Sequence, residues 1–401
     1  MTTENTHKVP NVPPLRFPEF SGEWEESTIG KEFELYSGNT PSRLDKENFV
    51  GDINWITSGE LKEHYIGDTK EKISESSAKE NNLKLMPEGT FVIAIYGLEA
   101  EGVRSTGSIT TKRSTISQAC MAFTPKGDIS NEFLYSWYMK HGNVIGLRYA
   151  QGTKQQNLSY DIIEKFKLRS PHPIEQNKIT SFIALLDKRI STQNKIIQHL
   201  ESLITGITQS VRDNATQKVL LRDVLTEKDE KNIGNHDVYS VSVSEGVINQ
   251  IDYLGRSFAA KETRNYNVVQ YGDIVYTKSP TGSFPYGIVK QSYIKEKAAV
   301  SPLYGVYKPV SFEVGYYLHH YFTSPIYTTN YLHKLIQKGA KNTINITNQR
   351  FLENYIPLPS PEVLEKYVAL VSAVTTKLEN EKQVINKLKE QKNYLLSKMF
   401  I

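Results

Sequence analysis

The sequence predicts an α+β protein in which two similar globular domains of mixed α and β structure alternate with two long helices. The chain has 401 residues, which is more than one hydrophobic core usually holds. A polar stretch that leads into a Pro-x-Pro occurs twice, at 152–179 and at 339–367. Each copy continues into an apolar heptad pattern, which is typical of long helices that pair.

The two copies match over much of the chain. Pro171 aligns with Pro359, and Pro173 aligns with Pro361 at the same offset. Glycine-led apolar strands are expected from Gly89 and from Gly272, and aromatic helices expected at 133–142 and 316–325 share the offset of these strands. A period close to half the chain indicates a duplicated domain rather than a solenoid. The short strands alternate with polar loops instead of regular crossover helices, which favours the α+β class.

The two helices are predicted from a heptad frame that begins at Ile179 and from the same frame carried to the second copy by the proline alignment. The predicted seam positions are Ile179, Ile183, Leu186, Ile190, Gln193, Ile197 and Leu200 in the first helix, and Val371, Val374, Leu378, Glu381, Ile385, Leu388 and Leu395 in the second. Gln193 and Glu381 occupy the same frame position, where a polar residue fixes register at some cost in stability. We expect helices of about 30 to 38 residues that begin near Pro173 and Pro361 and pair within the chain. An isolated helical hairpin or a seam between two copies of the chain is the alternative.

These features divide the chain into five segments. The predicted organisation is a mobile, proline-containing leader (1–16), a globular domain (17–170), a long helix (171–213), a second globular domain (214–358) and a C-terminal long helix (359–401).

Composition describes a soluble globular protein with little preference for a charged partner. Hydrophobic residues make up 38% and charged residues 23%, and the formal net charge is +4. This charge permits a polyanionic partner without requiring one. Cys120 is the single cysteine, which excludes an internal disulfide and fits a reducing compartment. Because no apolar run has the length of a membrane span or a signal peptide, we expect a cytoplasmic protein.

The motifs of catalysis and metal binding are missing from the sequence. It contains no G-x-x-x-x-G-K-[ST], no H-E-x-x-H and no G-x-G-x-x-G after a strand. The adjacent His319 and His320 cannot both face one metal from a helix, so we interpret them as partly buried structural residues. Cys120 lies in an apolar strand and is expected to be a buried thiol rather than a nucleophile. We therefore predict no catalytic residue and no metal site in this chain.

Four loops are basic, rich in amide and hydroxyl side chains, and free of carboxylates. The predicted DNA-binding residues in them are Arg104, Ser105, Lys112, Arg113, Lys154, Gln155, Gln156 and Asn157 in the first domain, and Lys278, Ser279, Thr281, Ser283, Lys341, Asn342, Asn345 and Arg350 in the second. Lys and Arg neutralise phosphates, while amides and hydroxyls read base edges. A single loop of this kind is usually only solvated, but its recurrence in both domains favours a nucleic-acid interface.

The sequence resembles the specificity subunit of a type I restriction-modification enzyme over nearly its whole length. The resemblance is carried by "PPLRFPEFSGEWEESTIG", "PEGTFVIAIYG", "ISQACMAFTP", "YGDIVYT" and "PHPIEQNKITSFIALLDKRI", in the context of the duplicated domain and helix. No single motif is decisive, but their order is specific. The second copy departs from the pattern, because "PSPEVLEKY" lacks the Glu-Gln pair of "PHPIEQNKI".

The resemblance implies a function without catalysis by this chain. The globular domains would be two target recognition domains, each binding one half of a bipartite, asymmetric sequence in double-stranded DNA. The helices would pack as an antiparallel coiled coil, dock two modification methyltransferase subunits and set the spacing of the half-sites. Restriction endonuclease/translocase subunits would join that core. S-adenosylmethionine, ATP and magnesium would be bound by these partners, and this chain would hold no cofactor.

Two other functions remain open from the residues alone. A scaffold with two protein-binding domains on a coiled-coil spacer explains the helices, but not the paired basic, amide-rich loops. An enzyme of unknown type is disfavoured by the lack of paired catalytic groups.

Overall fold

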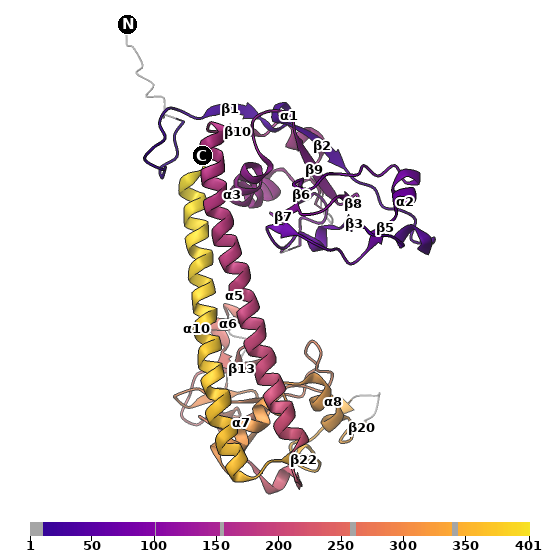
Figure 1. Cartoon of the computed structure of the whole chain (residues 1–401). Coiled ribbons are helices and arrows are strands. Elements are labelled where there is room, and N and C mark those ends of the chain that lie inside the picture. Colours follow the sequence, from indigo (N-terminus) through magenta and orange to yellow (C-terminus); the bar gives the residue numbers. More distant parts are fainter. Residues whose placement is uncertain (1–10, 101, 153–155, 257–261, 339–343) are drawn as a thin grey trace. The chain divides into compact units, whose positions relative to one another are not determined.

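A computed structural model describes residues 11–100, 102–152, 156–256, 262–338 and 344–401 (Figure 1). The chain forms two compact units, one made of residues 1–195 with 382–401 and the other of residues 196–381. Each unit combines small β-sheets with helices and includes one segment of each long helix. The predicted α+β class, with two similar mixed domains and two long helices, is confirmed.

The first unit is built on a five-stranded sheet of order β2-β9-β6-β7-β4, in which only β4 runs parallel to its neighbour. A three-stranded sheet β5-β3-β8 lies beside it, and β1 pairs with β10. The strands are β1 (Glu25–Thr28), β2 (Phe33–Ser37), β3 (Ile53–Ile56), β4 (Tyr65–Ile66), β5 (Lys72–Ile73), β6 (Phe91–Ala94), β7 (Gly107–Thr110), β8 (Ser114–Ile116), β9 (Cys120–Pro125) and β10 (Lys167–Ser170). The helices are α1 (Ile29–Glu32), η1 (Lys46–Phe49), η2 (Ser58–Glu60), α2 (Glu75–Glu80), α3 (Asn131–Tyr149), α4 (Tyr160–Ile163) and the start of α5 (Pro173–Asp213).

The position of strand β6 between two hydrophobic clusters explains why its sequence is apolar at every position rather than alternating. Phe91 and Ile93 contribute to the large core under α3, while Val92 and Ala94 contribute to a second cluster on the opposite face. Successive side chains of a strand point to opposite faces, so a sheet that is covered on both sides needs apolar residues at every position. Helix α3 begins at Asn131 because the Ser130 hydroxyl accepts a hydrogen bond from the Phe133 N–H at 3.2 Å.

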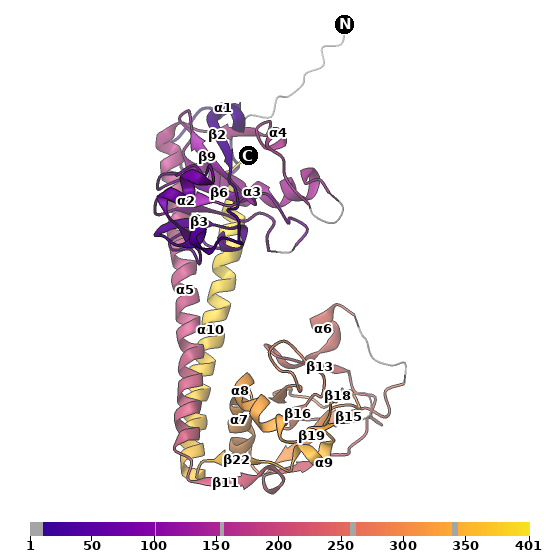
Figure 2. The same ribbon diagram turned by 90° about the vertical axis from the view of Figure 1, so that its right-hand side faces the viewer.

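The second unit repeats this plan with a four-stranded antiparallel sheet of order β12-β19-β16-β17 (Figure 2). Small pairs β13-β14, β15-β18 and β20-β21 surround it, and β11 pairs with β22. The strands are β11 (Gln217–Leu220), β12 (Leu225–Glu227), β13 (Tyr239–Ser242), β14 (Gly246–Asn249), β15 (Asn267–Val269), β16 (Ile274–Tyr276), β17 (Val289–Gln291), β18 (Ala298–Val300), β19 (Gly305–Pro309), β20 (Gln337–Lys338), β21 (Ile344–Asn345) and β22 (Tyr355–Leu358). The helices are η3 (Leu221–Asp223), α6 (Gln250–Leu254), α7 (Phe312–Tyr321), α8 (Pro325–His333), α9 (Asn348–Phe351) and α10 (Pro361–Met399).

The two sheets share one connection pattern, since β2-β9-β6-β7 and β12-β19-β16-β17 visit their strands in the same order. The glycines that led the repeated strands in sequence also share a conformation. Gly89 has φ +79° and Gly272 has φ +87°, a region that residues with a Cβ rarely adopt. The duplication seen in sequence is therefore a duplication of local backbone geometry as well.

The long helices α5 and α10 contain 41 and 39 residues, and their first residues, Pro173 and Pro361, are prolines that the sequence repeat aligns. Within each unit their segments run side by side in both views (Figures 1 and 2). In the first unit Lys392 on α10 forms an ion pair with Asp187 on α5. In the second, the Tyr367 hydroxyl lies 2.9 Å from the Thr208 hydroxyl. The helices therefore run in opposite directions, as an antiparallel pair.

The predicted seam positions of the helices are buried or half-buried throughout the pair. Within each unit, residues of the two helices pack with the core of that unit. Ile179 and Ile183 pack with Leu396, Met399 and Phe400 in the first unit. In the second unit Tyr367 and Val371 from α10 join the core, and partly buried Ile204 and Ile207 of α5 pack against it. This packing helps explain why α5 continues through Gly206, where glycine costs about 1 kcal/mol in a helix interior.

The end of the predicted mobile leader is not free. Residues 1–10 lie outside the described part of the chain, but Leu15 donates its N–H to the Lys398 carbonyl at 3.0 Å. The Arg16 guanidinium forms two hydrogen bonds of 2.7 Å with the carboxylate of Glu175, a buried residue in the first turn of α5. The contact with Arg16 gives the buried carboxylate at the helix start a charged partner. Mobility of the leader through residue 16 stays a prediction.

Cys120 is buried, and His319 and His320, which the sequence also indicated to be structural, are half-buried. Burial raises the pKa of the Cys120 thiol to about 12, which keeps it protonated and unreactive. Burial also lowers the pKa of His320 to about 4. Among the described residues, no helix is both long and apolar enough to cross a lipid bilayer.

Candidate nucleic-acid interface

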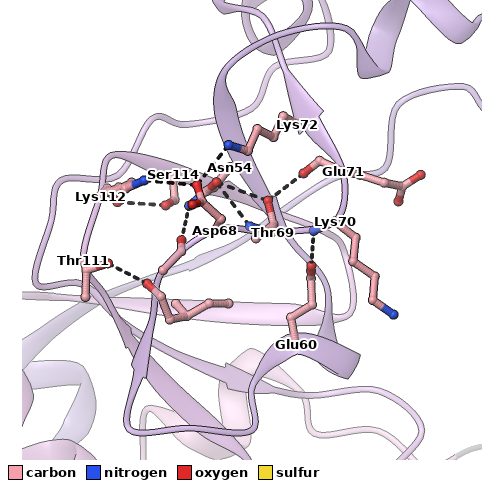
Figure 3. Close-up of polar contacts among 12 residues, drawn as sticks. Asn54, Glu60, Asp68, Thr69, Lys70, Glu71, Lys72, Thr111, Lys112 and Ser114 are labelled. Carbon is pink, nitrogen blue, oxygen red and sulfur yellow. Dashed lines mark hydrogen bonds and ion pairs between the residues drawn. The ribbon is translucent and has the colours of Figure 1, made fainter. Parts of the chain in front are cut away.

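Lys112 and Arg113 lie in a turn between β7 and β8 of the first unit, beside the loop that joins β4 to β5. Figure 3 shows the polar contacts around Lys112. The Asp68 Oδ1 atom lies 3.0 Å from Lys112 Nζ and 2.9 Å from Lys72 Nζ. The side chains of Lys112 and Asp68 are 58% and 61% exposed. Exposed pairs add little to stability, but this one gathers two cations at one point on the surface.

A buried amide holds the β4–β5 loop in shape. Asn54 on β3 is only 2% exposed. Its Nδ2 donates to the Gly67 carbonyl, and its Oδ1 accepts from the Thr69 N–H and hydroxyl at 3.4 and 3.3 Å (Figure 3). The backbone is thereby fixed on both sides of Asp68. The buried Asn54 side chain thus helps to set the position of Asp68 and of the exposed lysines paired with it.

The turn that carries Lys112 is tied to the same loop. The Thr111 hydroxyl donates to the Ile66 carbonyl at 2.9 Å, and the Thr111 N–H donates to the same oxygen at 3.1 Å. On the other side, the Ser114 hydroxyl donates to the Lys112 carbonyl at 2.8 Å. The two Thr111 hydrogen bonds therefore attach the turn to the backbone at the end of β4.

The neighbouring arginines are also paired with carboxylates. Arg113 Nη1 lies 2.8 Å from Glu75 Oε1, and Arg43 Nη1 lies 2.7 Å from Glu71 Oε1. Hydrogen bonds from Lys72 and Lys112 lower the pKa of Asp68, and those from Arg43 lower the pKa of Glu71. The loops are acid-free in sequence but not in space. A DNA phosphate that binds here would replace these carboxylates as the partner of the basic side chains.

Arg104 and Ser105 are less exposed than the sequence suggested. A Cβ added to Gly146 on α3 would lie 2.6 Å from Arg104 Cγ, so the arginine stem packs directly on that glycine. Arg104 Nε is buried without a hydrogen-bond partner, and Ser105 has φ +66°. Contact of these two residues with DNA remains a prediction.

Gln156 and Asn157 border an acidic side chain that the local sequence did not reveal. The Gln156 N–H donates to Glu99 Oε2 at 2.8 Å, which lowers the pKa of Glu99. Asn157 pairs through its backbone with Gln151 at 2.8 and 2.9 Å, and its Oδ1 is buried without a partner. Lys154 and Gln155 lie outside the described residues.

The predicted residues of the first unit therefore form two groups. Leu98 donates its N–H to the Gln156 carbonyl at 3.0 Å, which joins the segment before β7 to the 156–157 segment. Lys112 and Arg113 follow β7 at its other end. The members of the predicted set that the structure describes do not form one patch.

In the second unit the two predicted segments converge on Glu227 at the end of β12. Asn348 Nδ2 donates to Glu227 Oε1 at 2.8 Å. Burial lowers the pKa of Lys278, and the Glu227 charge partly opposes that shift. Ser279, Thr281 and Ser283 are exposed in the turn that follows. Lys278 is therefore a half-buried lysine that is influenced by the Glu227 charge, next to a hydroxyl-rich turn.

The remaining residues of the second unit are placed in part. Arg350 on α9 forms an ion pair with Glu353, and its Nε is buried without a hydrogen-bond partner. Asn345 lies on β21, paired with β20. Lys341 and Asn342 lie outside the described residues.

Lys72, which shares the Asp68 carboxylate with Lys112, was not predicted from the sequence, and neither were the nearby cations Arg43, paired with Glu71, and Lys70 of the same loop. These cations come from segments that also contain carboxylates, such as "DTKEK" at 68–72. The criterion of a loop without carboxylates therefore excluded them. Alternating charge in a short loop between two strands was the available signal.

Residues 21–202 match the family model described as the type I restriction modification DNA specificity domain. The resemblance to type I specificity subunits that the sequence suggested is confirmed by this match and by the relatives below.

Two curated relatives are type I restriction enzyme specificity subunits. The MjaIX subunit of Methanocaldococcus jannaschii is 27% identical over 192 residues, which are 45% of this chain and 42% of the relative. The EcoR124I/EcoR124II subunit of Escherichia coli is 26% identical over 212 residues, which are 53% of this chain and 50% of the relative. The chain thus spans about half the length of the curated relatives it matches.

Solved structures share the fold over almost the entire chain. The S subunit of a type I restriction-modification system from M. genitalium superposes with a TM-score of 0.60 at 14% identity, covering 97% of this chain and 99% of that one. A structure from a study of assembly and conformational transition of the type I R-M system gives a TM-score of 0.51 at 13% identity, covering 96% and 99%. At this identity the similarity concerns the fold.

Proposed function

We propose that this chain is the DNA sequence-recognition subunit of a type I restriction-modification complex, in which each globular unit reads one half of a bipartite target. The observation that carries the proposal is the repeated plan of the two units. The first contains residues 21–195 of the region 21–202 that matches a DNA specificity domain, and the second has the same strand order in its central sheet. A duplicated domain of this kind offers two DNA-reading surfaces.

The target is asymmetric, because the two units present different side chains. The first offers Lys112 paired with Asp68 and Arg113 paired with Glu75, while the second offers half-buried Lys278 and an exposed hydroxyl-rich turn. Base readout depends on which donors and acceptors face the groove. Two different sets of side chains therefore favour two different half-sequences.

The chain contributes recognition and not catalysis. Its helices α5 and α10 dock two modification methyltransferase subunits and set the half-site spacing, and restriction endonuclease/translocase subunits join the complex. S-adenosylmethionine, ATP and magnesium belong to those partners. Exposed apolar side chains on the outer faces of the helices, such as Leu185 at 65% and Leu370 at 51%, are available for such docking.

Fluorescence anisotropy with labelled DNA tests the proposal against the rival function of a protein scaffold. The full chain, with and without its methyltransferase partner, is titrated with duplexes of random sequence and with a pool of the same length enriched for methylated sites. We expect salt-dependent binding to both and tighter binding to the enriched pool. Equal, weak binding to both pools in the presence of the partner would favour the scaffold.

A further inference from the structure

His64 of the first unit lies in an unusual buried position, immediately before β4. It is 6% exposed, and its ring is stacked between two tyrosine rings. The centroid of Tyr65 is 4.1 Å away and that of Tyr135 on α3 is 3.9 Å away, with interplanar angles of 6° and 7°. The stack leaves the two ring nitrogens as the only polar edge of the imidazole.

Each ring nitrogen faces a carboxylate from a different helix. His64 Nε2 lies 2.9 Å from Glu132 Oε2 on α3, and Nδ1 lies 3.0 Å from Asp187 Oδ2 on α5. The second contact is close but poorly aligned for a hydrogen bond, so it acts through charge. Asp187 is also paired with Lys392 on α10, and the Tyr65 hydroxyl donates to Glu132 Oε1 at 2.9 Å. His64 thus pairs directly with α3 and α5, and it is linked to α10 through the ion pair of Asp187 with Lys392.

The geometry favours the charged imidazolium. A neutral imidazole carries one N–H and no charge, so it can serve only one of the two carboxylates, whereas the imidazolium presents an N–H and positive charge to both. Burial alone lowers the pKa of His64, but Asp187 and Glu132 outweigh it, so the pKa is raised above 6.5. Burial likewise opposes the charge of Asp187, but His64 and Lys392 outweigh it and lower its pKa below 3.8.

The charges around His64 come from every element that packs against it. The titratable groups are Lys62, Glu63 and Tyr65 from its own segment, Glu132 and Tyr135 from α3, Asp187, Lys188 and Lys195 from α5, and Lys389 and Lys392 from α10. The carboxylates in direct contact are Glu132 and Asp187. Removal of the imidazolium charge leaves Glu132 without its buried partner.

A short path of hydrogen bonds leads from His64 to the candidate interface. The His64 carbonyl accepts the Ile109 N–H at 2.8 Å, which aligns β4 with β7. Strand β4 then enters the loop in which Asp68 holds Lys112. A change in how His64 packs against α5 would therefore displace β4 and, with it, the loop next to the Lys112 turn.

We propose that His64, in its doubly paired charged form, is a positioning residue that fixes the DNA-reading loops of the first unit on the helix pair. The inference rests on the proposed function. Because the charged form is favoured in the folded protein, its contribution is fully present below about pH 6.5 and is lost as the pH rises through the raised pKa. Asp187 keeps its charge over this whole range, so His64 alone sets the upper limit.

The test measures recognition of each half-site against pH. The full chain with its methyltransferase partner is titrated, between pH 6 and 9, with a duplex carrying the target found by methylation mapping and with duplexes in which one half-site is scrambled. We expect discrimination at the half-site read by the first unit to fall about tenfold as His64 deprotonates, the order of one charge-assisted hydrogen bond. Discrimination at the other half-site stays constant.

His64→Gln removes the charge but keeps a donor, and it should give the low discrimination at every pH. The matched control is His199→Gln, because His199 is exposed on α5; it should keep the wild-type profile. A wild-type profile that is flat at both half-sites, or that His64→Gln retains, overturns the inference. Absence of specific binding at any pH would instead contradict the proposed function.

A measurement on the wild-type chain covers the case in which His64→Gln fails to fold. Histidines labelled with ¹³C are followed by NMR in the full chain, and the His64 signal is assigned as the one that Asp187→Asn shifts. Titration above 6.5 supports the inference, and a midpoint at or below the ordinary value of about 6.5 overturns it.

Discussion

Phe400, one residue beyond the end of α10, is expected to stabilise the first unit although it lies at the far end of the sequence. Its side chain is 0% exposed. The ring lies 5.2 Å from that of Phe133 and 6.4 Å from that of Trp24, measured between centroids. Its carbonyl accepts a hydrogen bond of 2.6 Å from Lys140 Nζ. Phe400→Ala removes the ring and keeps the backbone bond.

The expected loss follows from burial and from the aromatic contacts. Replacing a fully buried phenylalanine by alanine costs about 3 to 5 kcal/mol in a core that cannot collapse around the cavity. Since each 1.4 kcal/mol is a factor of about ten, the slowest amides of the first unit should exchange roughly 100 to 5,000 times faster. The matched control is Tyr394→Ala on the same helix, whose side chain is 59% exposed. It should change exchange by less than about threefold.

Hydrogen exchange of the intact chain, followed by mass spectrometry, reads out both units in one sample. Faster exchange should appear in peptides of the sheet β2-β9-β6-β7-β4 and of α3, while the sheet of the second unit should be unchanged. Equal acceleration in both units, or an effect of Phe400→Ala no larger than that of Tyr394→Ala, would refute the view that this residue completes the core of the first unit.

Two further predictions concern the interface and the helices. Lys112→Ala should weaken binding to all duplexes and lower the magnitude of the slope of log K against log salt by about 0.9, the value of one phosphate contact. Asp68→Asn should strengthen low-salt binding to random DNA. Filter binding across a salt series measures both effects, and an unchanged slope for Lys112→Ala would contradict a phosphate contact at Lys112. Insertion of one heptad in each helix, after Lys195 and after Glu381, keeps the seam and lengthens each helix by about 10 Å. The preferred spacer, measured by methylation of targets that differ only in spacer length, should grow by about three base pairs; unchanged preference would show that the helices do not set the distance.

The place of the insertion shows what the structure adds to the sequence. The heptad pattern predicts where the seam lies, because burial along a helix repeats with a fixed period. It does not show where the seam ends and a domain core begins. Ile204 and Ile207 continue the pattern but pack against the core of the second unit, so an insertion at 205–209 would disturb that core. The unit boundary near Lys195 is the better position.

The candidate site was predictable only in part. Lys112 and Arg113 could be named as candidates because basic, hydroxyl-rich loops are visible in sequence, and their contact with DNA stays a prediction. Their partners Asp68 and Glu75 were not, because these carboxylates lie far earlier in the chain and reach the turn only through the strand pairing of β3, β4, β7 and β8. His64 was missed for the same reason, since a lone histidine carries no signal until Glu132 and Asp187 meet it.

Methylation mapping of a domain exchange tests the central claim most directly. Residues 17–169 are replaced by the corresponding domain of another specificity subunit, and positions that contact α5 and α10, such as His64, are kept. The chimera and the parent are each expressed with the methyltransferase partner in a host without other methylation, and modified sites are read by sequencing. The account predicts that one half-sequence changes while the other half stays the same. Loss of both half-sequences, or the unchanged parental target, would contradict it.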